Sequence, residues 1–554
     1  MMVATTQDDS KQVEQAEGAK PSEKPKDKES TRDTIESILF AFVLAFMFRT
    51  FEAEAFVIPT GSMAPTLYGR HKEATCTECG NPIVVGASDE VNPETGYLFP
   101  DARVTSALCP NCGANNEQLY DALAFNGDRI IVNKYPYEFG DPERFDVFVF
   151  KFPEEPKTNY IKRLVGLPNE TIRIKGGNLY LVEDGAEQVL RKPPEKQRLI
   201  QIPVHDDDHA PRELLAAGWP ERWAGVKRGD IGRVAGWNET DDGWQADFDT
   251  RTYTISKDAG KESWLRYRHF FPTVNDWRNL KEGKPLDPRA RLIADLCSYN
   301  IYTGSDVRHF EAVSPSGIDL GTYWVADLTL NFDLQVSEVG SKPEVLLELV
   351  EGPSWYRCRI NVETGAAVLE EVNSQMNERV RELATASTPI QGAGSYSVSF
   401  ANVDDRLCLW VNNRLIDFGD GALIQPLGAV GNPFPTEMDL TPLGIAASNV
   451  SATVSHLKIE RDIYYRADFP QSDLKFQLNK GFQRDLERLL IDPNAWADAY
   501  LQKASELDLR TIEIGPDGYL ALGDNSPRSR DSRLWREDQQ AVPREFLVGQ
   551  AFWI

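Results

Sequence analysis

The chain has 554 residues, of which 41% are hydrophobic and 26% are charged, an ordinary composition for a globular protein. This length is enough for roughly three or four domains. The 85 acidic residues outnumber the 60 basic ones and give a formal net charge of −25. That balance argues against a nucleic-acid partner, because binding phosphates needs a basic surface. The 34 prolines and 39 glycines indicate many turns, and therefore a mainly β fold.

Residues 1–33 are polar and contain no aromatic side chain, so they predict a disordered tail. The apolar segment that follows predicts a membrane anchor over residues 34–57. Its uncharged core, Ser37–Phe48, has 12 residues, whereas a spanning helix needs about 20. A soluble helix and the apolar part of a cleaved signal peptide therefore stay open as alternatives.

An anchor is favoured because the run is apolar on every face and continues beyond Arg49, whose side chain can reach the membrane interface. Lysines of the tail then predict a single-pass protein in contact with membrane lipid. Its N-terminus would lie in the cytoplasm and the bulk of the chain outside.

Ser62 follows this run in the segment FVIPTGSMAPTL, residues 56–67. Pro59 and Pro65 stiffen its flanks, and Gly61 leaves room for a substrate backbone beside the hydroxyl. Thr60 offers a second hydroxyl. Because a serine becomes a nucleophile only with a base, this setting makes Ser62 a candidate that needs a partner elsewhere. A turn serine without chemistry is the alternative.

Two cysteine pairs interrupt the chain within residues 71–120. They are CTECG, with Cys76 and Cys79, and CPNCG, with Cys109 and Cys112. Each pair carries a glycine that lets the backbone turn, and four thiolates suit tetrahedral zinc. We expect a zinc-ribbon-like insertion with a structural zinc, since four cysteines leave no open position for catalysis. Two disulfides are the alternative, because thiols oxidise outside the cytoplasm.

Lys162 lies in the segment NYIKRLVGLPNETI, between Ile161 and an apolar turn. At the reference pKa near 10.4, about one lysine in a thousand is neutral near pH 7.5. Apolar neighbours lower that pKa, and values of about 7 to 8 suit a general base. Lys162 is therefore a chemically sensible base for Ser62, while a strand lysine that extends to solvent is the alternative.

Residues 183–470 form a second, larger insertion with strand-like alternation. The segment SYSVSFANVDDRLCLWVNNRLI, residues 395–416, predicts antiparallel hairpins with turns at NVDD and VNNR. This region, about residues 200–466, resembles the concanavalin A-like (laminin-G-like) β-sandwiches. The resemblance implies an antiparallel sandwich whose expected ligand is an envelope polymer or a protein partner. Residues 471–510 predict a helical connection back to the rest of the chain.

Four segments in order resemble the bacterial type I signal peptidases, which are membrane-anchored serine proteases with a Ser-Lys dyad. These segments are IPTGSMAPTL (58–67), NGDRIIVNKYPY (126–137), RFDVFVFKFPEEPKTNYIKRLVGLPNETIRI (144–174) and GYLALGDNSPRSRDSRLW (518–535). The resemblance implies a β catalytic core formed by residues 58–70, 121–182 and 511–554. It also implies a location in the bacterial inner membrane, with the catalytic domain on the periplasmic side.

The resemblance implies removal of signal peptides from exported preproteins after a small-x-small (Ala-x-Ala) site, with no cofactor for catalysis. Ser62 would be the nucleophile and Lys162 the general base. The Thr60 hydroxyl and the Ser62 N–H would form the oxyanion hole, and Ser529 would orient the lysine. Further implied residues are the dyad support of Asp524, Asn525, Asp531 and Arg533, and the substrate pocket of Ile58, Pro59, Met63, Leu67, Tyr160 and Ile161.

Three departures from the family pattern stand out. Thr60 replaces a common serine and keeps the hydroxyl, and Phe145 stands where glycine is usual. In the last segment SPRS replaces a longer polar run, although Ser529, Asp531 and Arg533 still align. The size of the second insertion keeps another hypothesis open, a catalytically impaired envelope protein whose sandwich binds a polymer or protein. A self-cleaving regulator of the related Ser-Lys class is a third hypothesis, against which the predicted anchor argues.

Overall fold

The structure is a computed structural model, and the chain in it divides into two compact units, residues 1–53 and 54–554. Residues 1–30 of the predicted tail lie outside the described residues. The described residues are 31–51, 53–92, 95–99, 102–226, 243–259, 262–304, 321–373, 379–427, 433–467, 488–503, 505 and 508–553.

The first unit contains helix α1 (Thr31–Phe51), which exposes apolar side chains such as Phe40 and Phe42. Within the described ranges, no helix combines the length and the apolar character that crossing a bilayer requires. The anchor predicted over residues 34–57 is therefore not supported. Charges at Glu36 and Arg49 limit its uncharged run, and its last residues belong to strand β1 (Ala53–Val57) instead.

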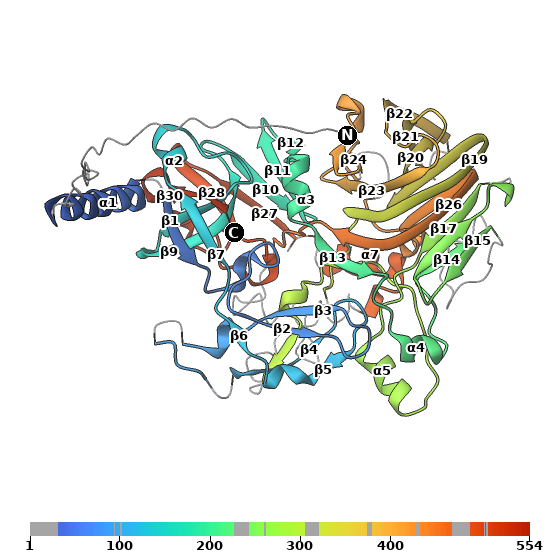
Figure 1. The fold of residues 1–554 in the computed structure, drawn as a ribbon, viewed down its shortest axis with the longest axis horizontal. Helices are drawn as coiled ribbons and strands as arrows, with labels where there is room; N and C mark the ends of the chain where they lie inside the picture. Colours follow the sequence, from blue (N-terminus) through green and yellow to red (C-terminus); the bar gives the residue numbers. More distant parts are fainter. Residues whose placement is uncertain are drawn as a thin grey trace, which may run out of the picture. The chain divides into compact units, whose positions relative to one another are not determined.

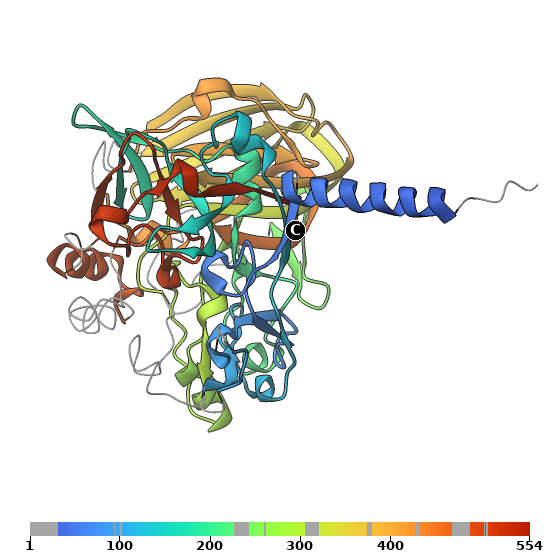
Figure 2. The same ribbon diagram turned by 90° about the vertical axis from the view of Figure 1, so that its left-hand side faces the viewer.

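Segments from both ends of the second unit meet in a seven-stranded sheet of order β1-β7-β30-β8-β9-β28-β29 (Figure 1). In the turned view of Figure 2, the last strands, drawn in red, again lie beside the early strands drawn in cyan. The predicted core segments are therefore brought together in space. The further strands are β7 (Arg129–Asn133), β8 (Val147–Phe152), β9 (Glu155–Gly166), β28 (Gly518–Leu522), β29 (Val542–Pro543) and β30 (Leu547–Trp553), with helix α2 (Tyr135–Phe139) after β7.

A four-stranded sheet of order β12-β11-β10-β27 holds the two ends of the large insertion. Strand β27 (Leu509–Glu513) follows the insertion and pairs with β10 (Thr171–Lys175), which precedes it. The insertion thus leaves and re-enters the core at neighbouring points, which is how a core tolerates a long insert. Strands β11 (Asn178–Glu183) and β12 (Ala186–Val189) extend this sheet a few residues past the predicted boundary at 182.

The two insertions share structure, although the sequence predicts separate modules. The cysteine region contributes β2 and β3 to one sheet of order β3-β2-β6, whose third strand follows the insertion, and β4 and β5 to another of order β18-β4-β5. Strand β18 (Tyr302–Gly304) comes from the second insertion and pairs with β4 (Val104–Leu108) of the first. The remaining strands are β2 (His71–Thr75), β3 (Pro82–Gly86), β5 (Asn115–Asn116) and β6 (Ala124–Phe125).

The second insertion is dominated by a 13-stranded sheet in which every pairing is antiparallel. The predicted hairpins are confirmed. Asp404 and Asp405 turn between two strands with φ of 52° and 54°, and Asn412 and Asn413 do so with 51° and 63°, the positive φ pair that tight hairpins favour. The strands are β13 (Ile202–Asp206), β14 (Trp223–Val226), β15 (Trp244–Asp247), β16 (Thr252–Ile255), β17 (Ser263–Tyr267), β19 (Leu328–Glu351), β20 (Ser354–Asn361), β21 (Ala366–Asn373), β22 (Arg379–Ser387), β23 (Gly394–Val403), β24 (Arg406–Val411), β25 (Arg414–Leu415) and β26 (Leu443–Arg461).

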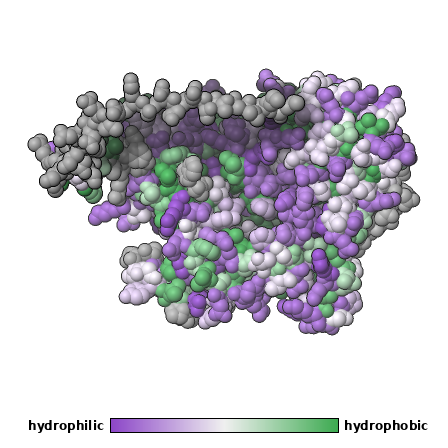
Figure 3. Space-filling model, in the orientation of Figure 1, coloured by the Kyte–Doolittle hydropathy of each residue, from purple (hydrophilic) through white to green (hydrophobic). Residues whose placement is uncertain are grey.

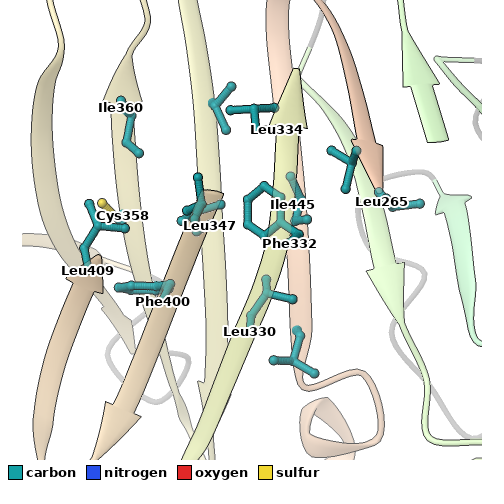
Figure 4. Packing of buried hydrophobic residues seen from close by; sticks show 14 of the residues in the cluster. Leu265, Leu330, Phe332, Leu334, Leu347, Cys358, Ile360, Phe400, Leu409 and Ile445 are labelled. Atoms are coloured by element: carbon teal, nitrogen blue, oxygen red, sulfur yellow. The ribbon is translucent and has the colours of Figure 1, made fainter. Parts of the chain in front are cut away.

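Two long strands organise this sheet. The first half of β19 pairs with β23 and its second half with β20, while β26 pairs with β19 along most of its length. Apolar side chains from these strands gather on one side, among them Phe332, Leu347 and Phe400 (Figure 4). Much of the face seen in Figure 3 is hydrophilic, in keeping with the acidic composition.

Short helices connect the strands of the second insertion. They are α3 (Pro194–Leu199), α4 (Arg212–Ala216) and α5 (Val274–Lys281). Helix α7 (Pro493–Lys503) lies in the helical connection predicted over residues 471–510, most of whose first half lies outside the described residues.

Candidate active site

Ser62 and Lys162, 100 residues apart, meet beside strand β9 of the seven-stranded sheet. Ser62 lies in a short 3-10 turn, η1 (Gly61–Met63), and Lys162 lies on β9. The Lys162 Nζ is 2.5 Å from the Ser62 Oγ and 3.0 Å from the Ile161 carbonyl oxygen. The register that pairs Lys162 with Phe148 fixes where the lysine emerges from the sheet. The structure thus brings the two predicted dyad residues into hydrogen-bond contact.

The electrostatic setting of Lys162 favours a base. Only 3% of the residue is exposed, and this burial lowers the pKa of its ammonium to about 8. Two carboxylates oppose that shift, but each is paired with an arginine: Asp531 with Arg533, and Asp524 with Arg163. At pH 7.5 about a quarter of such a lysine is neutral, against about one in a thousand for an ordinary one.

Arg163, which the sequence reasoning missed, ties the lysine strand to the closing segment. Its guanidinium binds Asp524 at 2.8 and 2.5 Å and also donates to the Phe145 carbonyl oxygen at 2.8 Å. Phe145 has a φ of 68°, in the left-handed region that favours glycine. This backbone conformation explains why glycine suits the position. In the sequence, only the position of Arg163 directly after the candidate lysine could have indicated this role.

The closing segment holds the serine turn from the other side. The Asn525 backbone N–H donates to the Ser62 carbonyl oxygen at 3.1 Å, and its side chain donates to the Gly61 carbonyl oxygen at 2.9 Å. Gly523 is needed for this approach, because a Cβ there would lie 2.4 Å from the Ser62 oxygen and 2.1 Å from the Ser529 Oγ. Its N–H donates to Asp531 at 2.9 Å.

Ser529 forms no hydrogen bond to Lys162, whose Nζ donates to the Ser62 hydroxyl and the Ile161 carbonyl. The Ser529 side chain is buried beside Asp531 instead. Burial alone would raise the pKa of Asp531, but the Arg533 guanidinium holds it below its usual value, with a contribution from the Ser529 hydroxyl. The structure therefore places Ser529 next to the dyad support, without a hydrogen bond to the lysine.

The predicted oxyanion and pocket residues fall into two groups. Thr60 is exposed, and its side chain makes no capping hydrogen bond to η1. Pro59, Tyr160 and Ile161 also reach the surface. The other predicted pocket residues pack inside, against the apolar side chains of Ile130, Val132 and Val149; they are Ile58, Met63 and Leu67.

Strand β9 offers an open edge beside the dyad. On one side it pairs with β8 at Glu155 and over Asn159–Arg163. On the other side, within the described part of the chain, its pairing with β28 covers Arg163–Gly166 and leaves the preceding residues free. An unpaired edge presents N–H and C=O groups that can bind an extended peptide.

The four predicted metal ligands form a compact cluster. The Sγ atoms of Cys76 and Cys112 are 3.6 Å apart, as are those of Cys79 and Cys109. Tetrahedral zinc with Zn–S bonds of about 2.3 Å separates its sulfurs by about 3.8 Å, whereas a disulfide needs about 2.05 Å. The glycine that follows each pair has a positive φ, 75° and 69°. These residues fit structural zinc, and none of the four forms a disulfide.

We expect the purified chain to carry about one zinc ion and Cys76→Ser to lose it, because three thiolates bind zinc much more weakly than four. Elemental analysis of the folded protein measures this. Cys358→Ser is the matched control, since Cys358 is a fully buried cysteine of the inserted sheet. Equal zinc contents in all three proteins, or disulfides within the four cysteines, would contradict the assignment.

Comparison with known proteins finds similarity to signal peptidases. Residues 114–230 match the family described as signal peptidase, peptidase S26. A signal peptidase I of Pseudomonas fluorescens is 40% identical over 82 residues, which are 12% of this chain and 29% of that protein. Signal peptidase I P of Bacillus subtilis subsp. natto is 29% identical over 149 residues, 27% and 49% of the two chains. Signal peptidase I of Leptolyngbya laminosa is 29% identical over 181 residues, 31% and 61% of the two chains.

The chain thus spans less than two thirds of the length of these relatives. Among solved structures, a carbohydrate-binding module from Bacillus subtilis covers 44% of this chain and 98% of its own, at 10% identity and a TM-score of 0.23. With a TM-score this low, the likeness identifies neither the fold nor a ligand of the inserted sheet.

Proposed function

We propose that this chain, a relative of the bacterial type I signal peptidases, is a serine endopeptidase that removes N-terminal signal peptides from exported preproteins. The observation that carries the proposal is the 2.5 Å contact between the Ser62 hydroxyl and the buried Lys162 amine, whose pKa is lowered to about 8. A hydroxyl beside a partly neutral amine is the arrangement that a Ser-Lys nucleophile needs.

In the proposed reaction, neutral Lys162 takes the hydroxyl proton of Ser62 while the Ser62 oxygen attacks the scissile carbonyl carbon. The negative oxygen that forms would accept hydrogen bonds from the Ser62 N–H and the Thr60 hydroxyl. Lys162 then gives its proton to the leaving amine as the peptide C–N bond breaks. Water, deprotonated by the same lysine, hydrolyses the remaining ester and releases Ser62.

Substrate would bind as an extended strand on the open edge of β9, next to Pro59. The apolar side chains of Ile58, Met63 and Leu67 fill the interior below this edge rather than lining an open pocket. We infer a preference for small side chains, as in an Ala-x-Ala site, because these buried side chains pack against Ile161 and occupy the space that a larger substrate side chain would need.

Membrane attachment on the periplasmic side of the inner membrane is part of this proposal. Helix α1 exposes apolar side chains around its circumference, among them Leu39, Phe40, Phe42 and Leu44. Such a surface binds lipid or another apolar partner. Attachment to a membrane would bring the enzyme to the place where an apolar signal peptide is located. Fractionation of cells should find the protein with membranes, and its recovery in the soluble fraction would count against attachment while leaving cleavage untouched.

The test of the proposed activity is cleavage of a preprotein carrying an Ala-x-Ala site by the detergent-solubilised full chain. We expect a single cut after that site, identified by the new N-terminus, and no detectable cut by Ser62→Ala. Ser395→Ala, an exposed serine on β23, should cleave like the wild type. Wild-type protein that fails on several preproteins would instead favour an impaired peptidase whose sheet binds a partner.

A further inference from the structure

A short turn of the second insertion, η6 (Ser298–Asn300), packs directly against the serine turn. The ring of Tyr299 lies where side chains of Gly61 and Gly86 would be, since a Cβ at these glycines would come within 2.0 and 2.6 Å of its Cε1 atom. The Tyr299 hydroxyl donates to the Arg70 carbonyl oxygen at 2.9 Å. The space beside Gly61, expected to admit substrate, is therefore filled by a residue of the insertion.

Asn300 reaches the serine turn through one intermediate, Asn525. The two side-chain amides bind each other reciprocally: Asn300 Nδ2 donates to Asn525 Oδ1 at 2.7 Å, and Asn525 Nδ2 donates to Asn300 Oδ1 at 2.9 Å. The second hydrogen of Asn525 Nδ2 is given to the Gly61 carbonyl oxygen at 2.9 Å. Both asparagines are almost fully buried, so water does not readily replace either partner.

The Gly61 carbonyl selects the orientation of the Asn525 amide, because an exchange of its oxygen and nitrogen would bring an oxygen against that carbonyl. Asn300 then holds the selected amide in place with two hydrogen bonds. Only the observed orientation lets Asn525 hold Gly61 through its side chain and Ser62 through its backbone N–H. These two contacts hold the carbonyl groups of Gly61 and Ser62, next to the serine hydroxyl that binds Lys162.

The turn η6 is itself held by the elements around it. Strand β18 follows it and pairs with β4 of the cysteine region. The Tyr302 hydroxyl accepts from the Arg528 guanidinium of the closing segment at 2.9 Å and donates to Asp89 at 3.2 Å. Asn300 therefore occupies a fixed place between the insertion and the catalytic core.

We infer that Asn300 is a positioning residue of the dyad: it holds the Asn525 amide in place, and Asn525 holds the serine turn in line with Lys162. This inference rests on the proposed peptidase function and deepens it, because the insertion then completes the catalytic site rather than being an accessory. Asn300 touches neither the reacting atoms nor the open edge of β9, so its loss should affect the chemical step more than substrate binding.

The test measures kcat and KM for preprotein cleavage by the full-length Asn300→Ala variant. We expect kcat to fall about 10- to 100-fold, as small displacements of catalytic groups do, with KM within about twofold of wild type. Asn275→Ala is the matched control, since Asn275 is an exposed asparagine of the same insertion and should cleave normally. Thermal unfolding of each variant separates a loss of fold from a loss of alignment.

A double variant distinguishes positioning from a general structural role. If Asn300 acts through Asn525, the Asn300→Ala/Asn525→Ala protein should be no slower than Asn525→Ala alone. Additive losses, or wild-type kcat in Asn300→Ala, would overturn the inference and leave the proposed function intact. If the wild type cleaves no preprotein, the rate at which an acylating probe labels Ser62 takes the place of kcat, and an unchanged rate in Asn300→Ala would equally overturn it.

Discussion

Lys162→Met is expected to lower the cleavage rate about 10³-fold and, at the same time, to raise the free energy of unfolding near pH 7 by about 3 kcal/mol. The rate falls because Ser62 loses its base. Stability rises because burial lowers the pKa of Lys162 from 10.5 to about 8. Near pH 7 the folded protein must therefore bury a charge that the unfolded chain exposes to water, and methionine fills similar space without one.

The sign of this effect depends on pH. Between pH 8 and 10.5 the unfolded state holds the Lys162 proton more tightly than the folded state, so wild-type stability gains from this group as pH rises. The advantage of Lys162→Met should be full below pH 8 and vanish above about 10.5. Below pH 8, kcat/KM of the wild type should rise about tenfold per pH unit, and above about pH 8 it should level off.

Denaturant unfolding of the full chain at pH 7 and pH 10.5, with cleavage assays alongside, measures both effects. Lys151→Met is the control, because Lys151 is an exposed lysine on the neighbouring strand β8 and should change neither quantity. A variant that loses activity and stability together would mean that Lys162 is a structural lysine rather than a strained base.

The contact between Ser62 and Lys162 was predicted from the resemblance to a known family, because local sequence marks each residue as a candidate but does not pair residues 100 positions apart. Ser62 and Lys162 each sit in an apolar segment that is unusual for a polar residue, and the four segments occur in the order of a known family. The same local logic predicted the hairpin turns at Asp404–Asp405 and Asn412–Asn413, since adjacent residues with positive φ have a recognisable composition. The hairpin turns depend on neighbours along the chain, whereas the pairing of Ser62 with Lys162 came from the order of the four segments.

The contacts of Tyr299 and Asn300 were not predictable in this way. Both residues reach partners more than 200 positions away, and neither belongs to a motif. The missing side chain of Gly61 has two physical explanations, access for a ligand or close packing by another residue, and sequence alone does not choose between them. The shared sheet of the two insertions was missed for the same reason, because pairing of β18 with β4 is a long-range event.

A second buried lysine provides the opposite case to Lys162. Lys192 is equally inaccessible, with 3% of the residue exposed. Its ammonium binds Asp404 at 2.7 Å and Asp462 at 2.6 Å. Burial alone would lower the pKa of Lys192, but the two carboxylates raise it above its ordinary value. The lysine follows β12 of the core, and its partners lie in the β23–β24 turn and just after β26, so this contact joins the core to the inserted sheet.

Lys192→Met is expected to destabilise the protein by about 3–5 kcal/mol, because it leaves two buried carboxylates without a counter-ion. The pKa of Asp462 is already raised to about 6 by burial, and without Lys192 it should rise further. Its protonation relieves the unpaired charge, so the destabilisation should shrink as pH falls from 7 to 5. Denaturant unfolding at these two pH values measures this dependence.

A comparison of the two lysine variants distinguishes the effect on stability of removing the charge from the effect of changing the side-chain volume. Lys162→Met and Lys192→Met make the same chemical change at equally buried sites, yet the first should stabilise and the second destabilise. Adding Asp462→Asn to Lys192→Met should restore part of the lost stability, because it removes one of the stranded charges. If both lysine variants shifted stability in the same direction, packing of the side chain rather than its charge would govern both sites.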